Sequence, residues 1–547
     1  MKSKVVTAAE AVSKIPDGAC IALGGVGGGG MATEIVESLA ARFDKEQHPG
    51  NVSVMHAGGN QTPRFLCKEG FMSAYYSGLP SIDSDLIKQN LFPVYSFSQG
   101  IILQLFRAQA NDSPYLTRAG VNTFVDPRVE AGAANEKAAA SPVVEVVTIK
   151  GEEYLHIDLP PITVAVIRGT TADTEGNLTF EEETVKHEAL YVAMAAHNHG
   201  GIVIAQAKYI APAGSLPGAE VKVPGMLVDY VVPYGNAEMP KMPGRPGKPD
   251  GAEKPGKPEG AEKPQRMAMP DFLSMAFGPG LTGYHKVDES IIPLESYKPD
   301  GDRLITVRRA AEELRPGYIC NIGIGIPVGI AYIASKERIH EMFTLTNEMG
   351  AIGGHMGGGM FFSNSFNARA YLHHHEMFDF INGHGLDISF LGAAEIDEDG
   401  SVNVTKIAGR IHGSGGFVNI SASTRKIVFL SSFTVGGKST GENGALKILE
   451  QGKSGKFLKK VDQLSFNGKD AVRRGQEIVY VTERAVFKLI GGKVTLIEYA
   501  DGLDIQKDIL DFMDFKPEIS PDLKKMPTYC FEDGVIGMKE QWEKMGL

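Results

Sequence analysis

The amino-acid sequence predicts an α/β protein of two related open domains with largely parallel sheets and an active site between them. Predicted strands alternate with predicted helices along most of the 547 residues, which is the pattern of a parallel sheet covered by helices. Three short segments also recur in the same order, which indicates a duplicated domain. A chain of this length can bury more than one hydrophobic core.

The recurring segments align the two copies. The paired segments are 18–24 with 317–323, 172–177 with 396–401, and 202–204 with 427–429. The separation is 299 residues for the first pair but 224 and 225 for the others. The first copy therefore carries additional residues after its first strand.

The chain begins with a helix, a strand and a glycine loop. Thr7, with Glu10 three residues later, is typical of a helix N-terminus, here over 7–16. A strand over 19–23 leads into a loop that is almost entirely glycine, and a helix is expected over 31–43. A dinucleotide-binding turn has the same outline, but glycines fill this loop so densely that a fingerprint match is nearly automatic. Such a turn is followed about twenty residues later by a second strand that ends in an acidic residue, and this sequence shows none clearly.

The α/β pattern continues in both copies. In the first copy we expect strands over 162–168 and 202–208 around a helix over 182–197. In the second copy we expect a strand over 318–322 and a helix that opens at Pro327, because proline is favoured in the first helical turn.

A segment rich in Pro, Gly, Lys and Glu separates the copies. A nine-residue unit occurs at 246–254 and again at 255–263, and large apolar residues are nearly absent. Such a segment cannot bury enough apolar surface to offset the entropy of ordering it, so we interpret it as a low-complexity linker. The predicted division is an N-terminal domain 1–235, a linker 236–275 and a C-terminal domain 276–547.

Composition excludes several classes of function. The formal net charge is −11, which argues against a nucleic-acid-binding protein. The N-terminus has no apolar signal-peptide region, and no apolar run reaches membrane-spanning length. The cysteines show no close pairing and no metal-ligand spacing, which suits a reducing cytoplasm: Cys20, Cys67, Cys320 and Cys530. We therefore expect a cytoplasmic protein without nucleic-acid or membrane partners.

Glu348 is the candidate catalytic residue. It follows the run 342–346, which predicts a short buried strand, and glycines follow it at 350, 353, 354, 357, 358 and 359. The glycines let the backbone turn sharply and leave no side chains near the carboxylate. Such a site suits a general acid/base or a carboxylate nucleophile. A helix N-cap or a surface acid beside a loop would explain the same pattern.

The run His373-His374-His375-Glu376 raises the question of a metal site. Adjacent residues on a helix or strand point in different directions, so neighbouring histidines do not form one ligand set. The sequence shows no second cluster with ligand spacing. We therefore expect an exposed turn at this run, and no bound metal.

Several motifs together resemble the family I CoA-transferases, and the resemblance spans about residues 5–520. The most similar group is the propionate/acetate (short-chain acyl) type. The motifs that carry the resemblance are the glutamate turn 348–354, the segments 378–380, 385–387 and 390–392, the glycine clusters 413–420 and 433–437, and the segments 481–487 and 498–504.

The resemblance implies a CoA-transferase fold, a specific reaction and its substrates. In the family the glutamate that matches Glu348 becomes covalently acylated, and CoA moves between a short-chain acyl-CoA and a free carboxylic acid such as acetate, propionate, butyrate or lactate. A carboxylate needs no neighbouring base at pH 7 because it is already ionised. The reaction would be ping-pong and pass through a glutamyl-CoA thioester. Coenzyme A would be a substrate, no cofactor would be tightly bound, and a homo-oligomer is expected.

The resemblance also implies roles for other residues. The glycine loops would supply backbone donors to the oxyanion, and Gln99 would orient a carboxylate unless it is simply a buried hydrogen-bonding residue. The flexible methionines Met31, Met349 and Met356 would adapt the acyl pocket, unless they are core residues. The residues assigned to the oxyanion and substrate are Gly25, Val26, Gly27, Gln99, Gly353, Gly354, His355 and Met356. Those assigned to CoA are Gly413, Gly415, Gly416, Gly436, Gly437, Lys406 and Lys438, with Arg410 as a further charge partner. Solvated surface charges would explain the lysines and the arginine equally well.

Two alternatives remain from the sequence. An acyl-CoA hydrolase on the same scaffold differs only in whether water or an acid resolves the thioester. A non-catalytic α/β binding protein would keep the pocket without the chemistry. Incubation with acetyl-CoA and propionate separates them, because only a transferase makes propionyl-CoA.

Overall fold

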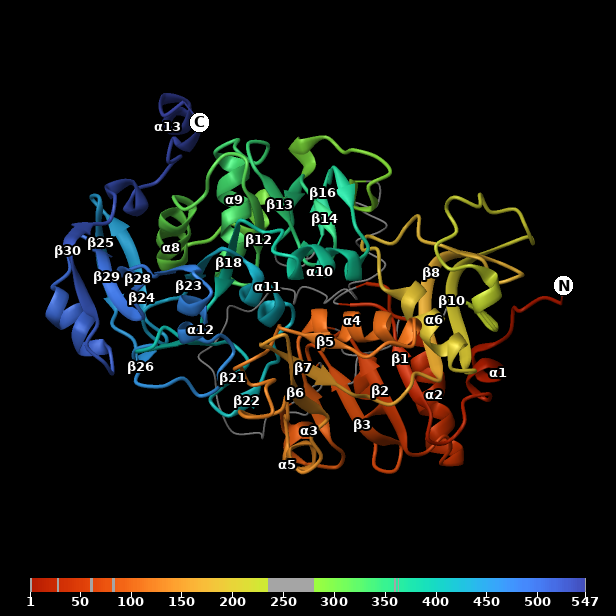
Figure 1. Ribbon diagram of the computed structural model, residues 1–547. Coiled ribbons are helices and arrows are strands. Elements are labelled where there is room, and N and C mark those ends of the chain that lie inside the picture. The colour runs from red at the N-terminus through yellow and green to blue at the C-terminus, as the bar shows by residue number, and fades with distance from the viewer. Residues whose placement is uncertain are drawn as a thin grey trace, which may run out of the picture.

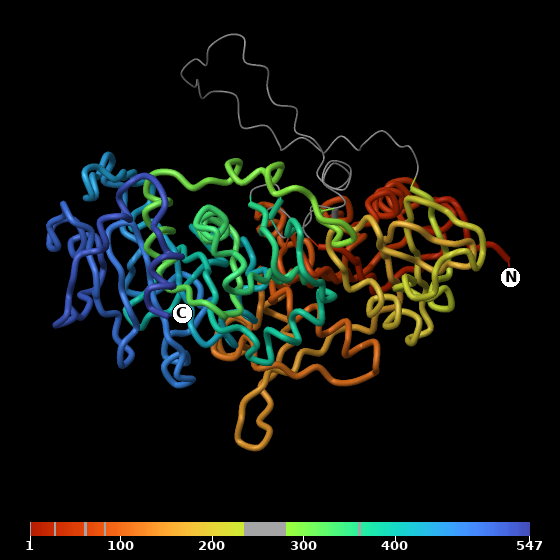
Figure 2. The backbone as a smooth tube through the Cα atoms, turned by 90° about the horizontal axis from the view of Figure 1, so that it is seen from above, coloured from red at the N-terminus to blue at the C-terminus, as the bar shows by residue number. Residues whose placement is uncertain are grey.

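The computed structural model describes residues 2–26, 29–59, 62–80, 84–234, 280–358, 361–362 and 364–546, and it places two sheets side by side (Figure 1). The N-terminal half, red to yellow, holds the first sheet, and the C-terminal half, green to blue, holds the second. Figure 2 shows these halves at opposite ends of an elongated molecule.

The first sheet has eight strands among the described residues, and seven of them run parallel. Their order across the sheet is β11 (Tyr230–Pro233), β10 (Ile202–Ala211), β8 (Val164–Asp173), β1 (Cys20–Leu23), β2 (Val52–His56), β3 (Met72–Ser77) and β4 (Val94–Ser96). The short β9 (Leu178–Thr179) pairs antiparallel with β8. Strand β1 is buried at every residue, as expected for a parallel strand covered on both faces.

The second sheet has ten strands in the described part of the chain, with a parallel centre and antiparallel additions. Its centre is β13 (Thr344–Thr346), β12 (Ile319–Ile322), β18 (Ile388–Gly392), β23 (Lys426–Leu430) and β27 (Glu477–Val481). On one side lie β14 (Ala351–Ile352) and β17 (Ala370–Tyr371); on the other lie β28 (Ala485–Ile490), β29 (Lys493–Tyr499) and β30 (Glu518–Lys525).

The two sheets share one topology, which confirms the predicted duplication of an open α/β domain. The order β2-β1-β8-β10-β11 in the first sheet corresponds to β13-β12-β18-β23-β27 in the second. The recurring segments fall on equivalent strands, since 18–24 contains β1 and 317–323 contains β12. Likewise, 202–204 lies in β10 and 427–429 in β23.

Helices cover the sheets and meet where the halves touch. The first half has α1 (Ala8–Val12), α2 (Thr33–Glu46), α3 (Ser84–Lys88), α4 (Gln99–Ala110), α5 (Glu136–Ala139) and α6 (Ala189–Asn198). The second half has α8 (Gly301–Ala311), α9 (Gly329–Lys336), α10 (His374–Asn382), α11 (Phe417–Ser423), α12 (Gly468–Arg473) and α13 (Met538–Lys544). Helix α4 of the first half contacts α10 and α11 of the second, near the middle of Figure 1.

Smaller sheets complete the fold. They are formed by β5 (Leu116–Thr117), β7 (Glu152–Ile157) and β6 (Val144–Ile149); by β15 (His355–Met356) and β16 (Ser365–Phe366); by β20 (Val402–Asn403), β19 (Glu395–Asp397) and β26 (Phe457–Leu458); by β21 (Lys406–Ile407) and β22 (Arg410–Ile411); and by β24 (Lys438–Glu442) and β25 (Ala445–Glu450). The described residues contain no helix that is both long and apolar enough to cross a membrane.

The predicted elements mostly exist, and the differences have local causes. The Thr7 hydroxyl accepts the N–H of Glu10 and caps α1, as predicted. Helix α6 begins seven residues later than predicted, because the N–H of Glu182 donates to the Thr170 hydroxyl, outside any helix. Pro327 lies in a single 3₁₀ turn, Ile326–Val328, that leads into α9. The linker 236–275 lies outside the described residues, so the boundaries 1–235 and 276–547 stay predictions.

Candidate active site

Glu348 lies in the tight turn between β13 and β14. The Asn347 side chain organises this turn, because its carbonyl oxygen accepts the N–H groups of Met349 (3.0 Å) and Ala351 (3.3 Å). Gly350 has a φ of +105°, and a Cβ there would lie 2.1 Å from the carbonyl oxygen of Leu372. The turn therefore needs glycine, and it presents Glu348 at the carboxyl end of a strand, as the sequence predicts.

The Glu348 side chain is buried and incompletely hydrogen bonded. The residue is 8% exposed, and its Oε2 has no hydrogen-bond partner among the described residues. Burial raises the pKa of the carboxyl, while a hydrogen bond from the backbone N–H of Glu348 and the electrostatic interaction with His374 act in the opposite direction. Both alternative explanations of this residue are wrong, because Glu348 neither caps a helix nor lies on the surface. A buried polar oxygen without a partner is typical of a site that receives a ligand.

A buried ion pair joins the two halves beside Glu348. Glu188 immediately precedes α6 in the first half, and His374 begins α10 in the second. Both are completely buried, with the Glu188 Oε2 and the His374 Nδ1 3.3 Å apart. Burial alone would raise the pKa of Glu188, but the hydrogen bond and charge of His374 outweigh it and lower this pKa to about 2.

The same glutamate holds the first glycine loop. Its Oε1 accepts the N–H of Gly25 at 2.9 Å, and the carbonyl of Gly25 lies 3.1 Å from the His56 Nε2. Burial lowers the pKa of His56 to about 4, so the ring is neutral and donates from Nε2. Gly25, Glu188 and His374 thus form a buried chain from one half to the other, and His374 acts electrostatically on Glu348.

The predicted oxyanion donors are engaged elsewhere. The N–H of Gly25 is bound to Glu188, that of Val26 donates to Gly29, and that of Gly353 donates to Leu345 at 2.7 Å. These three N–H groups therefore do not form the predicted oxyanion hole in this arrangement. The predicted donor Gly27 lies outside the described residues. Gly354 shapes the backbone instead, since a Cβ there would lie 2.2 Å from the carbonyl of Phe366.

Gln99 and the glycine cluster 413–416 do come together near Glu348. Gln99 begins α4 and is 3% exposed, and its Nε2 lies 3.7 Å from the sulfur of Met349, the residue after the glutamate. The N–H of Gln99 and the hydroxyl of Ser98 both donate to the carbonyl of Gly415, at 2.7 and 2.8 Å. The neighbouring Gly413 packs against residues 79–80, where a Cβ would meet Pro80 at 2.6 Å.

The other residues assigned to CoA lie apart from this group. Gly436 and Gly437 precede β24, where the exposed Lys438 pairs with the exposed Glu450. Lys406 lies 3.7 Å from Asp462, and Arg410 is exposed on β22. No contact between these residues and the Glu348 turn is found within the described ranges. Their assignment to CoA stays a prediction.

The three methionines lie in different hydrophobic cores. Met31 is buried in the core of the first half and Met356 in that of the second. Met349 lies in a third core between the halves. The burial of Met31 and Met356 favours the alternative that they are core residues, and the shared acyl pocket stays a prediction. His355 contacts a different element, since its Nδ1 is 3.0 Å from the hydroxyl of Ser335 on α9.

The histidine run is not an exposed turn. His374 is completely buried and His375 is 4% exposed, because the start of α10 inserts between the halves. The ring of His375 packs edge-on against Tyr191 at 4.2 Å. Sequence reasoning considered this run only as a metal site and missed Glu188 altogether. Glu188 and His374 are 186 residues apart, and no sequence pattern indicates that they interact.

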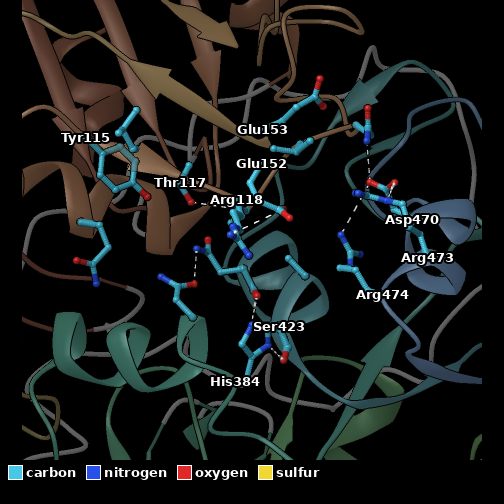
Figure 3. Close-up of a pocket in the computed structure, with 18 of the residues that line it drawn as sticks. Tyr115, Thr117, Arg118, Glu152, Glu153, His384, Ser423, Asp470, Arg473 and Arg474 are labelled. Atoms are coloured by element: carbon cyan, nitrogen blue, oxygen red, sulfur yellow. Dashed lines mark hydrogen bonds and ion pairs between the residues drawn. The ribbon is translucent and has the colours of Figure 1, made fainter. Parts of the chain in front are cut away.

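A separate cavity of about 710 Å³ opens between the halves at the other end of α10 (Figure 3). Its lining includes Asn382, where α10 ends, but not Glu348. Two of its arginines form ion pairs with nearby acidic residues: Arg118 lies 3.8 Å from Glu152, and Arg473 lies 3.4 Å from Asp470. This cavity is therefore distinct from the candidate active site.

Comparison with known proteins identifies the family. Residues 5–233 match the family described as coenzyme A transferase. The chain is 38% identical to the caffeate CoA-transferase of Acetobacterium woodii, covering 98% of this chain and 99% of that protein. It is 37% identical to the acetate CoA-transferase YdiF of Escherichia coli O157:H7, covering 97% and 96% of the two chains.

The fold agrees with this relationship. A crystal structure of YdiF from Escherichia coli O157:H7, described as a thioester complex with CoA, matches with a TM-score of 0.83 at 36% identity. The match covers 98% of this chain and 97% of that one. The chain belongs to the coenzyme A transferase family, and it is an acyl-CoA transferase.

Proposed function

We propose that this enzyme transfers CoA between a short-chain acyl-CoA and a free carboxylic acid, with Glu348 as the covalent nucleophile. The observation that carries the proposal is the Glu348 carboxylate, buried between the two halves with one oxygen unpartnered in the described structure. Its place at the carboxyl end of a strand of an open α/β sheet is where such folds bind ligands.

The chemistry uses the carboxylate twice. An oxygen of Glu348 attacks the thioester carbonyl carbon, the carbon–sulfur bond breaks, and CoA leaves as a thiolate with the electron pair. The thiolate then attacks the glutamyl carbonyl of the mixed anhydride and releases the donor acid as its carboxylate. The resulting glutamyl-CoA thioester returns to glutamate when an acceptor carboxylate runs these two steps in reverse. No proton is gained or lost, and the kinetics are ping-pong.

His374 is the residue we assign to keep the nucleophile charged. Burial favours the neutral form of Glu348, and the charge of His374 opposes this. Glu188 holds the ring through its Nδ1, while Nε2 makes no hydrogen bond within the described chain. A hydrogen-bond donor held beside the reacting carboxyl would also stabilise the oxyanion of each step. His374 is therefore a positioning and electrostatic residue next to the nucleophile.

Gln99 and Asn347 are the further side-chain donors we propose. The N–H groups of Gly25, Val26 and Gly353 are engaged. The Asn347 Nδ2, in contrast, is buried and unpartnered among described residues. The Gln99 amide reaches the residue next to Glu348. Water must be excluded because both intermediates hydrolyse, and burial between two halves serves this purpose.

The acyl group is proposed to be short. The sequence resembles the short-chain acyl type, and the chain is similar to an acetate CoA-transferase. Its similarity to a caffeate CoA-transferase makes an aromatic acid the competing substrate. One added methylene changes binding by only about 1–3 kcal/mol, so breadth among short acids is expected.

The test is product analysis with acetyl-CoA and a panel of acids from acetate to hexanoate, with caffeate included. The proposal expects propionyl-CoA from propionate and the highest kcat/KM among the short acids. Free CoA without a new thioester would show a hydrolase instead. A strong preference for caffeate would refute the short-chain assignment but not the transfer mechanism.

The remaining expectations from the sequence are part of this proposal. They are a cytoplasmic location, a homo-oligomeric state, and CoA contacts along Gly413–Gly416 and Gly436–Gly437. The division into domains 1–235 and 276–547 is proposed on the two sheets of shared topology.

A further inference from the structure

We propose that Glu289, His340 and His355 form a binding site for a divalent transition-metal ion of the zinc class. One ligand atom from each residue lies within 4.8 Å of the other two. The residues come from three segments: the 3₁₀ turn Glu289–Ile291, the stretch after α9, and β15. This inference replaces the sequence prediction that the chain holds no metal, and it does not depend on the proposed reaction.

The spacing of the His355 and Glu289 ligand atoms fits a tetrahedral ion. The His355 Nε2 and the Glu289 Oε1 are 3.4 Å apart. Zinc bonds of about 2.0–2.1 Å at the tetrahedral angle separate two ligand atoms by roughly 3.3 Å. An ion can therefore bridge these two atoms without moving either side chain.

The nitrogens are buried, and hydrogen bonds do not account for them. His355 is 5% exposed at its side chain, yet its Nε2 makes no hydrogen bond in the described structure. The Nδ1 of His340 is likewise buried without a partner there. Unsatisfied buried nitrogens of this kind need an explanation, and a bound ion provides one for both rings.

A hydrogen bond to Ser335 can hold the His355 ring in the form that binds a metal through Nε2. The ring Nδ1 lies 3.0 Å from the Ser335 hydroxyl oxygen. When that oxygen accepts the Nδ1 proton, the lone pair is on Nε2, which faces Glu289. Metal-bound histidines are held by such a hydrogen bond on the other ring nitrogen.

The two imidazole rings lie side by side, with 4.1 Å between their centroids. A neutral imidazole pair with one carboxylate is a donor set that zinc, cobalt and nickel accept.

The ion would link two parts of the second half. Glu289 is 64% exposed and belongs to the segment that runs along this half in Figure 2. His355 follows Glu348 by seven residues, in the loop that leaves the active-site turn. Lys336 and Glu295 already form an ion pair that ties the same segment to α9. The role of the metal is therefore that of a tether, with a solvent-facing position left for water.

Zn²⁺ titration of the full-length, metal-free protein by calorimetry tests the site, with Co²⁺ absorption as a report of tetrahedral geometry. We expect one equivalent to bind, and both Glu289→Gln and His340→Ala to weaken that binding by about tenfold or more. Glu289→Gln changes an exposed side chain and should fold normally.

His48→Gln is the matched control, because His48 and Asp17 form an exposed histidine–carboxylate pair at 3.0 Å with no third ligand among the described residues. It should leave the binding unchanged. A wild type that binds no saturating equivalent of Zn²⁺, or binding that survives in both site variants, would overturn the proposal. The Glu348→Gln variant should bind the metal normally while lacking transferase activity. Failure of the metal proposal can therefore be distinguished from failure of the proposed transferase mechanism.

Discussion

At the residue scale, the site is defined by the electrostatics of one buried carboxyl. Glu348 is removed from water, which disfavours the charged form that must act as nucleophile. His374 supplies a compensating charge, and Glu188 holds His374 in place. The reactivity of the nucleophile thus depends on a neighbour from the same half and on a second residue from the other half.

Glu348→Gln should abolish transfer and leave the fold intact. The amide cannot form the anhydride or the thioester, and the replaced oxygen makes no hydrogen bond with the described residues. Measurement of kcat together with the melting temperature checks this. Near-normal turnover by the variant would contradict the assignment of the nucleophile.

His374→Gln should move the acid limb of the pH profile of kcat/KM to higher pH. Glu348 must be ionised, so activity falls as the pH drops through its raised pKa. Without the His374 charge that pKa rises further, and more alkaline conditions are needed to ionise the carboxyl.

His384→Gln is the control for this profile, because His384 lies beyond the other end of α10, where its ring bonds the Ser423 carbonyl at 2.8 Å. Its acid limb should coincide with that of the wild type. An unchanged limb in His374→Gln, with only a uniform loss of activity, would indicate a merely structural role for His374.

At the element scale, the turn between β13 and β14 determines where Glu348 points. Asn347 closes the turn with its side chain, and Gly350 allows the close approach of Leu372. The short strands on either side are held by backbone bonds, so the carboxylate position is a property of the turn as a unit.

Gly350→Ala should therefore lower both stability and activity. The residue has a positive φ and no room for a Cβ, and such strain costs about 1–3 kcal/mol before the clash is relieved. Gly218→Ala is the control, since a Cβ there meets nothing within 4 Å and the φ is not positive. Thermal unfolding and kcat/KM measure both. Equal effects of the two substitutions would contradict the proposed role of the turn.

Elements could be predicted from the sequence where the signal is local. Strands β1 and β12 follow from apolar runs ahead of glycine loops, and the duplication follows from segments in the same order. The start of α6 was missed because the backbone near Glu182 bonds to Thr170 on a neighbouring strand. The turn that carries Glu348 could be predicted because a strand and glycines flank it. Glu188 was missed because its partners lie 163 and 186 residues away.

At the scale of the whole molecule, the active site exists only where the two halves meet. The Gln99 N–H bonds the carbonyl of Gly415 across this contact, and Gly100 lies so close that a Cβ would be 2.3 Å from the Phe378 ring. The buried Glu188–His374 pair crosses the same contact. The candidate active site therefore depends on the contact between the two halves.

Glu188→Gln should destabilise the protein by about 3 kcal/mol at pH 7, because it removes one partner of a buried ion pair. The lowered pKa of Glu188, about 2, means that its contribution is present above the unfolded value of about 4.3 and is lost as the pH falls toward 2. The difference from wild type in urea unfolding should shrink over that range.

Glu182→Gln is the control, since Glu182 pairs with Lys208 where the two side chains are 41% and 36% exposed. Its effect should stay below about 1 kcal/mol. A Glu188→Gln variant no less stable than Glu182→Gln would show that the buried pair does not hold the halves together.

The most direct test of the central claim is to trap the covalent intermediate. The enzyme is incubated with acyl-CoA and then with borohydride, which reduces a glutamyl thioester to an alcohol, and its peptides are weighed by mass spectrometry. The mechanism predicts that the peptide containing Glu348 changes mass, and that the Glu348→Gln variant shows no such change. A modified residue on any other peptide, or full turnover with no modified peptide, would contradict Glu348 as the nucleophile.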